Sequence, residues 1–457
     1  MKPARQTKWF AKFENNKLVI AGLAFCLCLL VGATAYRTHA QYSVPSNSFD
    51  WSDRGHADFH CGTYYPTLGY RNGLSPYSKQ LMEEYPVSSP ARASPPISFL
   101  IHLPFTYLDL HAADVAFFIY NTALLLVLAF FTVQVTRGSP SSFWWLVVSC
   151  ALMISRPGHI TLFTGYFTAE LVLGTVFAFH FAKTRPLVSG LGMLIASGKT
   201  TYVLPLIVLM LARKNYRATL YGLLFCLISG IGGLAWLAKD VGITEILNGI
   251  QEAQAVFYSE ETEYPINTWT RVDLVGMFAR TINWIPRDSV YLAGMFVMLA
   301  IPSFAIWKTA DHESDSGITG ATALIALLAM LTSVYHHSYD CMLIFIPWVG
   351  LVFFGERMLP GFGARSKLWL KLLLSVPVFN YLSTLTVRNL VGWEQISVGW
   401  HIATLLSGGC LLVALTIVVL TVLKRPETLE RPERSPCLLY TSPSPRDRTR
   451  SRMPSSA

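Results

Sequence analysis

Residues 18–36 read LVIAGLAFCLCLLVGATAY, a run of 19 residues without a charged side chain. An α-helix of this length, rising about 1.5 Å per residue, is nearly long enough to cross the roughly 30 Å hydrocarbon core of a bilayer. Five Lys and Arg residues precede the run within residues 1–17, against the single acid Glu14. Because positive flanks stay in the cytoplasm, the run predicts a membrane-spanning helix with a cytoplasmic N-terminus.

The segment Ala33-Thr34-Ala35 also resembles a signal-peptidase site, so cleavage behind it is an alternative. In both cases the chain that follows emerges on the outer side of the membrane.

The composition of the whole chain extends this interpretation. Of 457 residues, 52% are hydrophobic and 14% are charged, against about 25% charged residues in a typical soluble domain. This excludes soluble, disordered, collagen-like and small disulfide-stapled proteins. The net charge of +9 comes from short basic clusters between apolar runs, which is typical of membrane topology and not of nucleic-acid binding. No nucleic-acid partner is expected.

Further apolar runs predict more membrane passes. They cover residues 112–135, 142–156, 163–182, 218–238, 289–307, 318–334, 341–355, 369–386 and 400–423. Two shorter stretches within 187–212 are separated by Ser197-Gly198-Lys199-Thr200-Thr201. They fit a hairpin of half-length helices, because irregular backbone at membrane depth must line protein or water.

The basic residues between these runs fall on one side when 187–212 is counted as an in-and-out pair. We therefore predict an all-α polytopic protein with roughly 11–13 transmembrane helices. Both termini are expected in the cytoplasm, as in a multi-pass inner-membrane protein. The candidate site is expected on the periplasmic, outer face.

The predicted domain organisation is simple. Residues 1–434 form one transmembrane domain with a first outer loop at 37–111 and a second at 239–288. Within the first loop, the apolar stretch 97–108 is too short to span and predicts an interfacial or re-entrant helix. Residues 435–457 form a basic Ser/Pro tail that is expected to be disordered and resembles a translated cloning adapter.

The eight cysteines show no CxxC spacing, so a structural zinc site is not expected. Cys61 and Cys341 both fall on the predicted outer face. A disulfide between them and two separate buried thiols are the two alternatives.

Two polar clusters on the outer face are candidates for chemistry. The first loop carries Asp58, which is either a general base for a hydroxyl group or a solvated loop acid. Residues His60, Tyr64, Tyr65 and Tyr77 of the same loop are candidates for substrate contacts. The second cluster contains His336, His337 and Asp340. It could bind phosphate, assist proton transfer or ligate a metal, although one ligand pair without a third partner argues little for a metal.

Two cations near the membrane are candidates for binding an anion such as a lipid phosphate. Lys199 lies between the two half-length helices, and Arg156 lies at the mouth of a predicted span. Neutralising a phosphate is one use for such a residue, and snorkelling to the interface is the other. Glu170, early in the next span, is expected to pair with one of these two cations.

The order of these motifs resembles glycosyltransferase family 87 of the GT-C superfamily. The resemblance covers roughly residues 15–425 and rests on motifs that occur in the same order. They are Asp58-Phe59, Tyr64-Tyr65, Gly73-Leu74-Ser75-Pro76-Tyr77, Pro95-Pro96, Ser155-Arg156-Pro157 with Gly165, Lys199, and Tyr335-His336-His337-Ser338-Tyr339-Asp340. The chain departs from the pattern at Tyr166, where the family often has Gln, and at Ala93-Ser94, where it usually has Tyr-Pro.

The resemblance implies an inverting transfer of a sugar, mannose or another hexose or pentose, from a polyprenyl-phosphate donor. The acceptor would be a glycolipid or glycan on the outer side of the bilayer. Asp58 matches the family's catalytic base. Lys199, Arg156, His336, His337 and Asp340 become candidates for binding the donor phosphate or the acceptor. No cofactor and no divalent metal are expected, because side chains alone can neutralise a monophosphate leaving group.

Two other classes remain open. A transporter or flippase of lipid-linked sugars would carry ionisable residues near the midplane of both halves, whereas here the polar clusters share one face. A membrane scaffold without activity would use the same loops to contact partners.

Overall fold

The computed structural model describes residues 12–41, 55–87, 90–91, 94–259, 267–311, 317–355, 358–359, 361–394 and 397–424. Within these residues the chain is helical, and its one β-bridge pairs Arg271 with His337. The tail 435–457 and Cys437 lie outside the described residues. The architecture is the all-α membrane fold that the sequence predicts.

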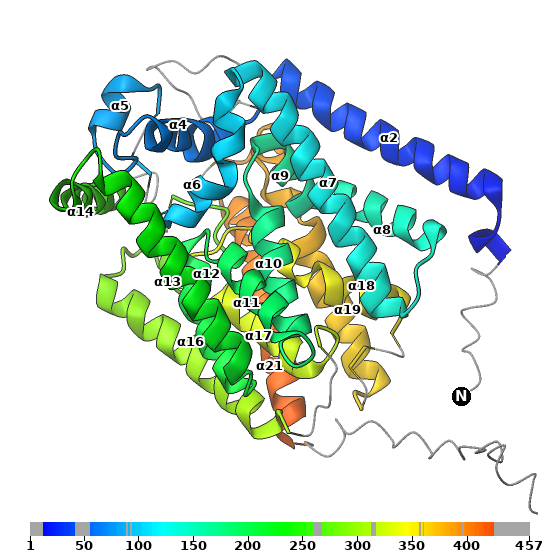
Figure 1. Cartoon of the computed structure of the whole chain (residues 1–457). Helices are drawn as coiled ribbons and strands as arrows, with labels where there is room; N and C mark the ends of the chain where they lie inside the picture. Colours follow the sequence, from blue (N-terminus) through cyan, green and yellow to red (C-terminus); the bar gives the residue numbers. More distant parts are fainter. Residues whose placement is uncertain are drawn as a thin grey trace, which may run out of the picture.

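Five helices are long and apolar enough to cross a membrane. They are α2 (Lys17–Ala40), α7 (Leu110–Arg137), α13 (Tyr216–Ala238), α16 (Asp288–Thr309) and α21 (Val398–Lys424). Each coincides with a predicted span, and α2 begins after an N-cap in which Asn16 Oδ1 accepts a hydrogen bond from Leu18 N. In Figure 1, α7, α13, α16 and α21 run through the bundle, and α2 lies along one side.

Two pairs of helices are bent and count as one span each only if taken together. Helices α8 (Ser142–Ile154) and α9 (Arg156–Thr164) meet at 68°. Helix α19 (Ala364–Phe379), followed by the turn η6 (Tyr381–Ser383), meets α20 (Leu385–Val391) at 61°. The first bend falls at Ser155, whose extended backbone is what a following proline favours.

Five further apolar helices are shorter than a span. They are α10 (Thr168–Phe181), α11 (Pro186–Ala196), α12 (Thr200–Ala212), α17 (Ala321–Ser333), and η5 (Asp340–Ile344) continued by α18 (Phe345–Phe353). By length and composition the described residues thus hold five to seven spans, and the predicted 11–13 counted these short helices as complete passes. The predicted hairpin at 187–212 is present as α11 and α12.

Close packing explains how α11 lies in the bundle. It packs between α10 and α13, and its Gly192 faces Gly174 of α10. A Cβ atom at Gly174 would lie 2.7 Å from the carbonyl oxygen of Gly192. Glycine at both positions lets the two backbones approach, as small residues do between membrane helices.

The two outer loops contain more helix than the sequence predicts. The first holds α3 (Ala57–Phe59), η2 (His60–Tyr64), α4 (Tyr65–Arg71), α5 (Gln80–Glu84), α6 (Pro96–His102) and η3 (Leu103–Tyr107). Of these, α6 and η3 form the short helical segment predicted at 97–108. The second loop holds α14 (Ile243–Ser259) and α15 (Leu274–Thr281), where no helix was predicted. Figure 1 shows α4, α5, α6 and α14 gathered at one end of the bundle.

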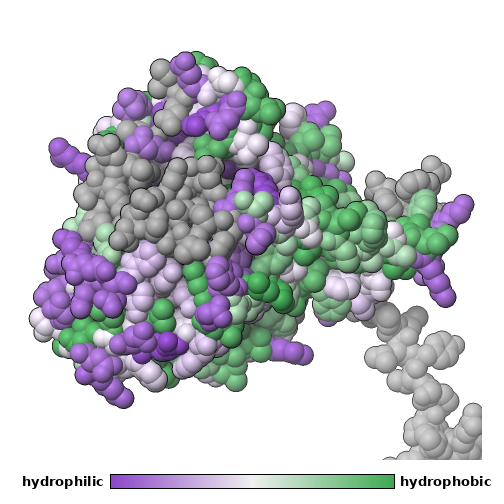
Figure 2. Space-filling model, turned by 90° about the horizontal axis from the view of Figure 1, so that it is seen from above, coloured by the Kyte–Doolittle hydropathy of each residue, from purple (hydrophilic) through white to green (hydrophobic). Residues whose placement is uncertain are grey.

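This end of the molecule is the polar one. Seen from above, hydrophilic residues surround the grey segments, whereas the flank that extends to the right is largely apolar (Figure 2). Cys61 and Cys341 are buried as separate free thiols, so the structure contains no disulfide between them.

Candidate active site

Residues Val334–Tyr339 connect α17 to η5 as an extended segment. It pairs with residues 270–272, since Val272 N donates to His336 O (2.9 Å) and Ser338 N donates to Thr270 O (2.7 Å). Side chains of an extended chain alternate between two faces. Accordingly, His336 and Ser338 are buried, whereas Tyr335, His337 and Tyr339 remain partly exposed.

The buried face of this segment surrounds the carboxylate of Asp340. Its oxygens accept hydrogen bonds from Lys199 Nζ (2.8 Å), Tyr202 OH (2.8 Å), the backbone N–H of His337 (2.9 Å) and His336 Nδ1 (3.1 Å). Asp340 is fully buried, and the Lys199 side chain is 10% exposed. A buried carboxylate requires such compensation. The structure therefore brings together four predicted site residues from 141 positions apart in the chain.

Aromatic rings enclose the Lys199 ammonium. Its Nζ lies 5.1 Å from the ring centroid of Tyr339, 5.5 Å from that of Tyr166 and 5.7 Å from that of Tyr202. Cations at such distances are attracted to the ring faces. An ammonium group has three donors, of which Asp340 uses one, so Lys199 is held in place while retaining capacity for an anion.

Asp58 of α3 lies near this cluster and is partly exposed. The pKa of the Tyr339 phenol is raised by burial and by neighbouring groups, among them Asp340 and Asp58. This electrostatic interaction links the first outer loop to the segment 334–339. A carboxylate, an ammonium group and a phenol thus meet at the polar end of the bundle.

Residues beside Asp58 are fixed by a buried acid of α7 that the sequence reasoning missed. Asp114 Oδ1 lies 2.8 Å from His56 Nδ1 and 2.8 Å from His60 Nε2. All three side chains are buried. His60, a predicted substrate-contact residue, therefore holds the loop to α7. The available signal was Asp114 itself, an acid inside an apolar run.

The backbone around His56 is constrained as well. His56 adopts the left-handed conformation at φ 61°, and its N–H donates to Phe163 O (2.8 Å). Gly165 at φ +72° ends α9 beneath it, and a Cβ there would lie 2.7 Å from Phe59 Cβ. Only glycine fits this left-handed, crowded position. The turn before Asp58 is thus shaped by α9 and α7.

A second buried ion pair joins α6 to α10. His102 Nε2 lies 2.9 Å from Glu170 Oε1, and His102 Nδ1 lies 2.6 Å from Ser98 O. Burial alone would lower the pKa of His102, but the Glu170 carboxylate outweighs it and the pKa is raised. Glu170 was expected to pair with Lys199 or Arg156, which is wrong: its partner is His102. The pairing fixes the short helix α6 beside the site.

Arg156 is buried in a different set of contacts. Its Nη1 donates to Asn380 O (3.0 Å) and to Ser383 Oγ, and its Nη2 donates to Ser383 O (3.2 Å). The side chain is 3% exposed. These bonds join α9 to η6, so the structure favours an anchoring function for Arg156 over the predicted contact with a phosphate.

The three tyrosines predicted as substrate contacts differ in their surroundings. Tyr64 OH donates to Leu108 O (2.8 Å), and Tyr77 OH donates to Ser94 O (2.7 Å). Both hydroxyl groups thus hold the first loop together. Tyr65 is partly exposed against Tyr85, and burial raises its pKa to about 12.

A buried Arg–Asp pair, also missed by the sequence reasoning, borders the site. Arg271 Nε and Nη2 each lie 2.8 Å from an oxygen of Asp273, and both residues are at most 2% exposed. The pKa of Asp273 is lowered because Arg271 outweighs the effect of burial. The guanidinium carbon lies 4.5 Å from the ring centroid of Tyr335, which extends the site along the exposed face of the segment.

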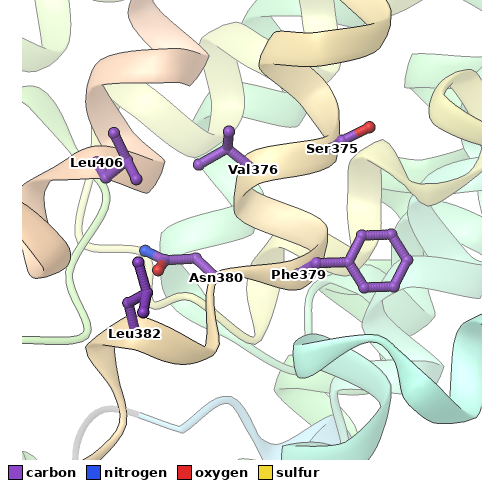
Figure 3. A pocket seen from close by; sticks show the side chains of 6 residues that line it. All are labelled: Ser375, Val376, Phe379, Asn380, Leu382 and Leu406. Atoms are coloured by element: carbon purple, nitrogen blue, oxygen red, sulfur yellow. The ribbon is translucent and has the colours of Figure 1, made fainter. Parts of the chain in front are cut away.

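Two other features complete the survey. Among the described residues, no three His, Cys, Asp or Glu side chains are arranged to hold a metal ion. A pocket of about 290 Å³ lies between α19 and α21 (Figure 3) and is lined by Ser375, Val376, Phe379, Asn380, Leu382 and Leu406. It has no acid, base or cation in its lining, so it offers less chemistry than the cluster around Lys199.

The chain was compared with known proteins. A model of glycosyltransferase family 87 matches residues 94–333, which is 240 of 457 residues. No curated protein and no solved structure matches. The matched region includes Gly165, Lys199 and Arg271, whereas Asp58 and the segment 334–340 lie outside it.

Proposed function

The chain belongs to glycosyltransferase family 87, and from this membrane glycosyltransferase identity we propose its donor, its base and its side of action. The donor is a polyprenyl-phosphate sugar, with mannose or another hexose or pentose as the sugar. The acceptor is a glycolipid or glycan on the extracytoplasmic side, and the transfer inverts the anomeric centre. The observation that carries the proposal is the convergence of Asp58, Lys199 and Asp340 around Tyr339.

Asp58 acts as the general base. Its carboxylate takes the proton of the acceptor hydroxyl while the hydroxyl oxygen attacks the anomeric carbon from the face opposite the phosphate. A positioned base contributes about 10²–10⁴-fold to such a step. Asp58 suits this function because it is partly exposed and stands beside partners that fix its loop.

Lys199 supports departure of the leaving group. As the bond between the anomeric carbon and the phosphate oxygen breaks, its electron pair remains on the lipid monophosphate, which gains negative charge. A fixed cation beside that oxygen stabilises the transition state. Asp340 holds Lys199 in place at 2.8 Å, so the ammonium group need not be ordered during the reaction.

The donor reaches the site sideways from the bilayer, between α6 and the hairpin α11–α12. Helix α6 packs on α13, where Pro96 contacts Gly233. Leu227, Ile228 and Ile231 of α13 are exposed by 57–67%, as expected of residues that face lipid tails. A long isoprenoid chain would find an apolar path there while its phosphate meets Lys199.

The test is sugar transfer by the full chain in lipid nanodiscs. Radiolabelled polyprenyl-phosphate sugars and the matching nucleotide sugars are supplied in parallel with membrane glycolipid extract. Transfer from the lipid-linked donors alone supports the proposal. Transfer from nucleotide sugars alone contradicts the donor. In sealed vesicles, movement of the lipid-linked sugar across the bilayer without transfer would favour the flippase alternative.

A further inference from the structure

The partly exposed face of the segment 334–339 carries a row of stacked rings. Ring centroids lie 4.7 Å apart between Tyr335 and His337, 5.0 Å apart between His337 and Tyr339, and 5.1 Å apart between Tyr339 and Tyr166. We call these four residues the aromatic row. The alternation of the extended segment places three of them on one face, so the row follows from the backbone pairing with residues 270–272.

The row is close to electrically neutral along its length. At one end the charge of Lys199 is paired with Asp340, and at the other the charge of Arg271 is paired with Asp273. Between them, burial and the nearby cation Lys199 lower the pKa of His337 to about 3, so its imidazole is uncharged at neutral pH. An anionic ligand would therefore find no unpaired cation along the middle of the row.

Neutral aromatic rings with polar edges suit a saccharide. A pyranose ring has a C–H face that stacks on aromatic surfaces and a rim of hydroxyl groups. Tyrosine and histidine offer an apolar body with a polar tip, and Thr270 Oγ1, 2.7 Å from His337 Nδ1, adds a hydroxyl group beside the row. The row begins at Tyr339, next to Asp58 and Lys199, and leads away toward Tyr335.

We propose that the aromatic row binds an uncharged saccharide, with the sugar nearest Tyr339 presented to Asp58 and the remaining sugars extending toward Tyr335. That this saccharide is the acceptor rests on the proposed function. That the row binds a saccharide rests on its geometry and charge alone. Tyr335 then selects acceptors that carry more than the reacting sugar.

The test measures binding by saturation-transfer difference NMR, using the full chain in lipid nanodiscs with no donor present. The probes are methyl α-glycosides of mannose, glucose and galactose, the corresponding disaccharides, and inorganic phosphate. We expect at least one disaccharide to bind more tightly than its monosaccharide. We expect the strongest saturation on the C–H protons of one pyranose face, and no displacement by phosphate.

A matched pair of variants tests the ring itself. Tyr335→Phe keeps the aromatic ring, whereas Tyr335→Leu keeps an apolar side chain without a ring. We expect Tyr335→Phe to bind the disaccharide within about twofold of the original chain and Tyr335→Leu to bind roughly three- to tenfold more weakly. Tyr216→Leu, at an exposed tyrosine of α13, serves as the control and should change nothing.

Several results would overturn the inference. They are equal binding by the Phe and Leu variants, displacement of the saccharide by phosphate, or no binding of any saccharide up to the solubility limit. Loss of binding in both variants with an unchanged melting temperature would overturn the stacking argument as well. Because no turnover is involved, a chain that binds saccharides but transfers no sugar contradicts the proposed function and leaves the aromatic row standing.

Discussion

Lys199 Nζ and Asp340 Oδ2 lie 2.8 Å apart, although 141 positions separate them in the sequence. The pair connects the hairpin α11–α12 to the segment that follows α17. It also holds the cation beside Tyr339 and Tyr166. One ion pair thus joins the fold of the bundle to the geometry of the candidate site.

Breaking this pair on one side should destabilise the protein. Lys199→Met leaves the buried carboxylate of Asp340 uncompensated, which costs about 3–5 kcal/mol. In Lys199→Met/Asp340→Asn the second change removes that charge, so we expect part of the stability to return while sugar transfer does not. Thermal unfolding in detergent measures the first effect. Additive losses in the double variant would show that the two residues are not coupled.

Asp114 should act through the position of Asp58. Asp114→Ala leaves His56 and His60 without the carboxylate that they share, at about 1–3 kcal/mol for each unsatisfied group. Misplacement of the base by about 1 Å costs around 10²-fold in rate, so kcat should fall while KM for the donor stays near its original value.

The control for Asp114 lies on the same helix. Asp109→Asn replaces the N-cap of α7, whose Oδ1 accepts from Ala112 N, by a residue that caps equally well. It should leave both stability and transfer unchanged. If Asp114→Ala raised KM for the donor and left kcat intact, Asp114 would contribute to binding and not to the placement of Asp58.

The His102–Glu170 pair predicts a dependence of stability on pH. Because the pKa of His102 is raised above 6.5 in the folded protein, its contribution is fully present below pH 6.5 and is lost as pH rises through the folded value. The difference in melting temperature between the original chain and His102→Asn should therefore shrink as the pH increases. His39→Asn, at an exposed histidine of α2, should show no such trend. A constant difference across the range would mean that His102 is not charged in the fold.

The membrane helices could be predicted from run length and charge, because apolar runs of about 20 residues have few alternatives in a membrane. The helix α9 was missed because Arg156-Pro157-Gly158 resembles a turn, yet proline is tolerated in the first turn of a helix. Helix α14 was missed because its polar residues suggested a loop. It is amphipathic, and Ile246 and Ala253 are buried.

The site could be predicted in part for a similar reason. Asp58, Lys199, His336 and Asp340 stand out as polar residues in predicted outer segments. Asp114 and Glu170 lie inside apolar runs, where their partners come from segments 58 and 68 positions away. Such pairings depend on tertiary packing, which a single sequence does not display. The aromatic row likewise depends on the pairing of residues 334–338 with residues 270–272.

The central claim is that Asp58 is the catalytic base. Its most direct measurement is the rate of sugar transfer from a polyprenyl-phosphate donor by the original chain, by Asp58→Asn and by the control Glu84→Gln, at an exposed acid of the same loop. We predict a fall of about 10²–10⁴-fold for Asp58→Asn, with an unchanged melting temperature and an unchanged rate for Glu84→Gln. Equal rates for all three proteins would contradict the claim and leave Asp58 as a loop acid.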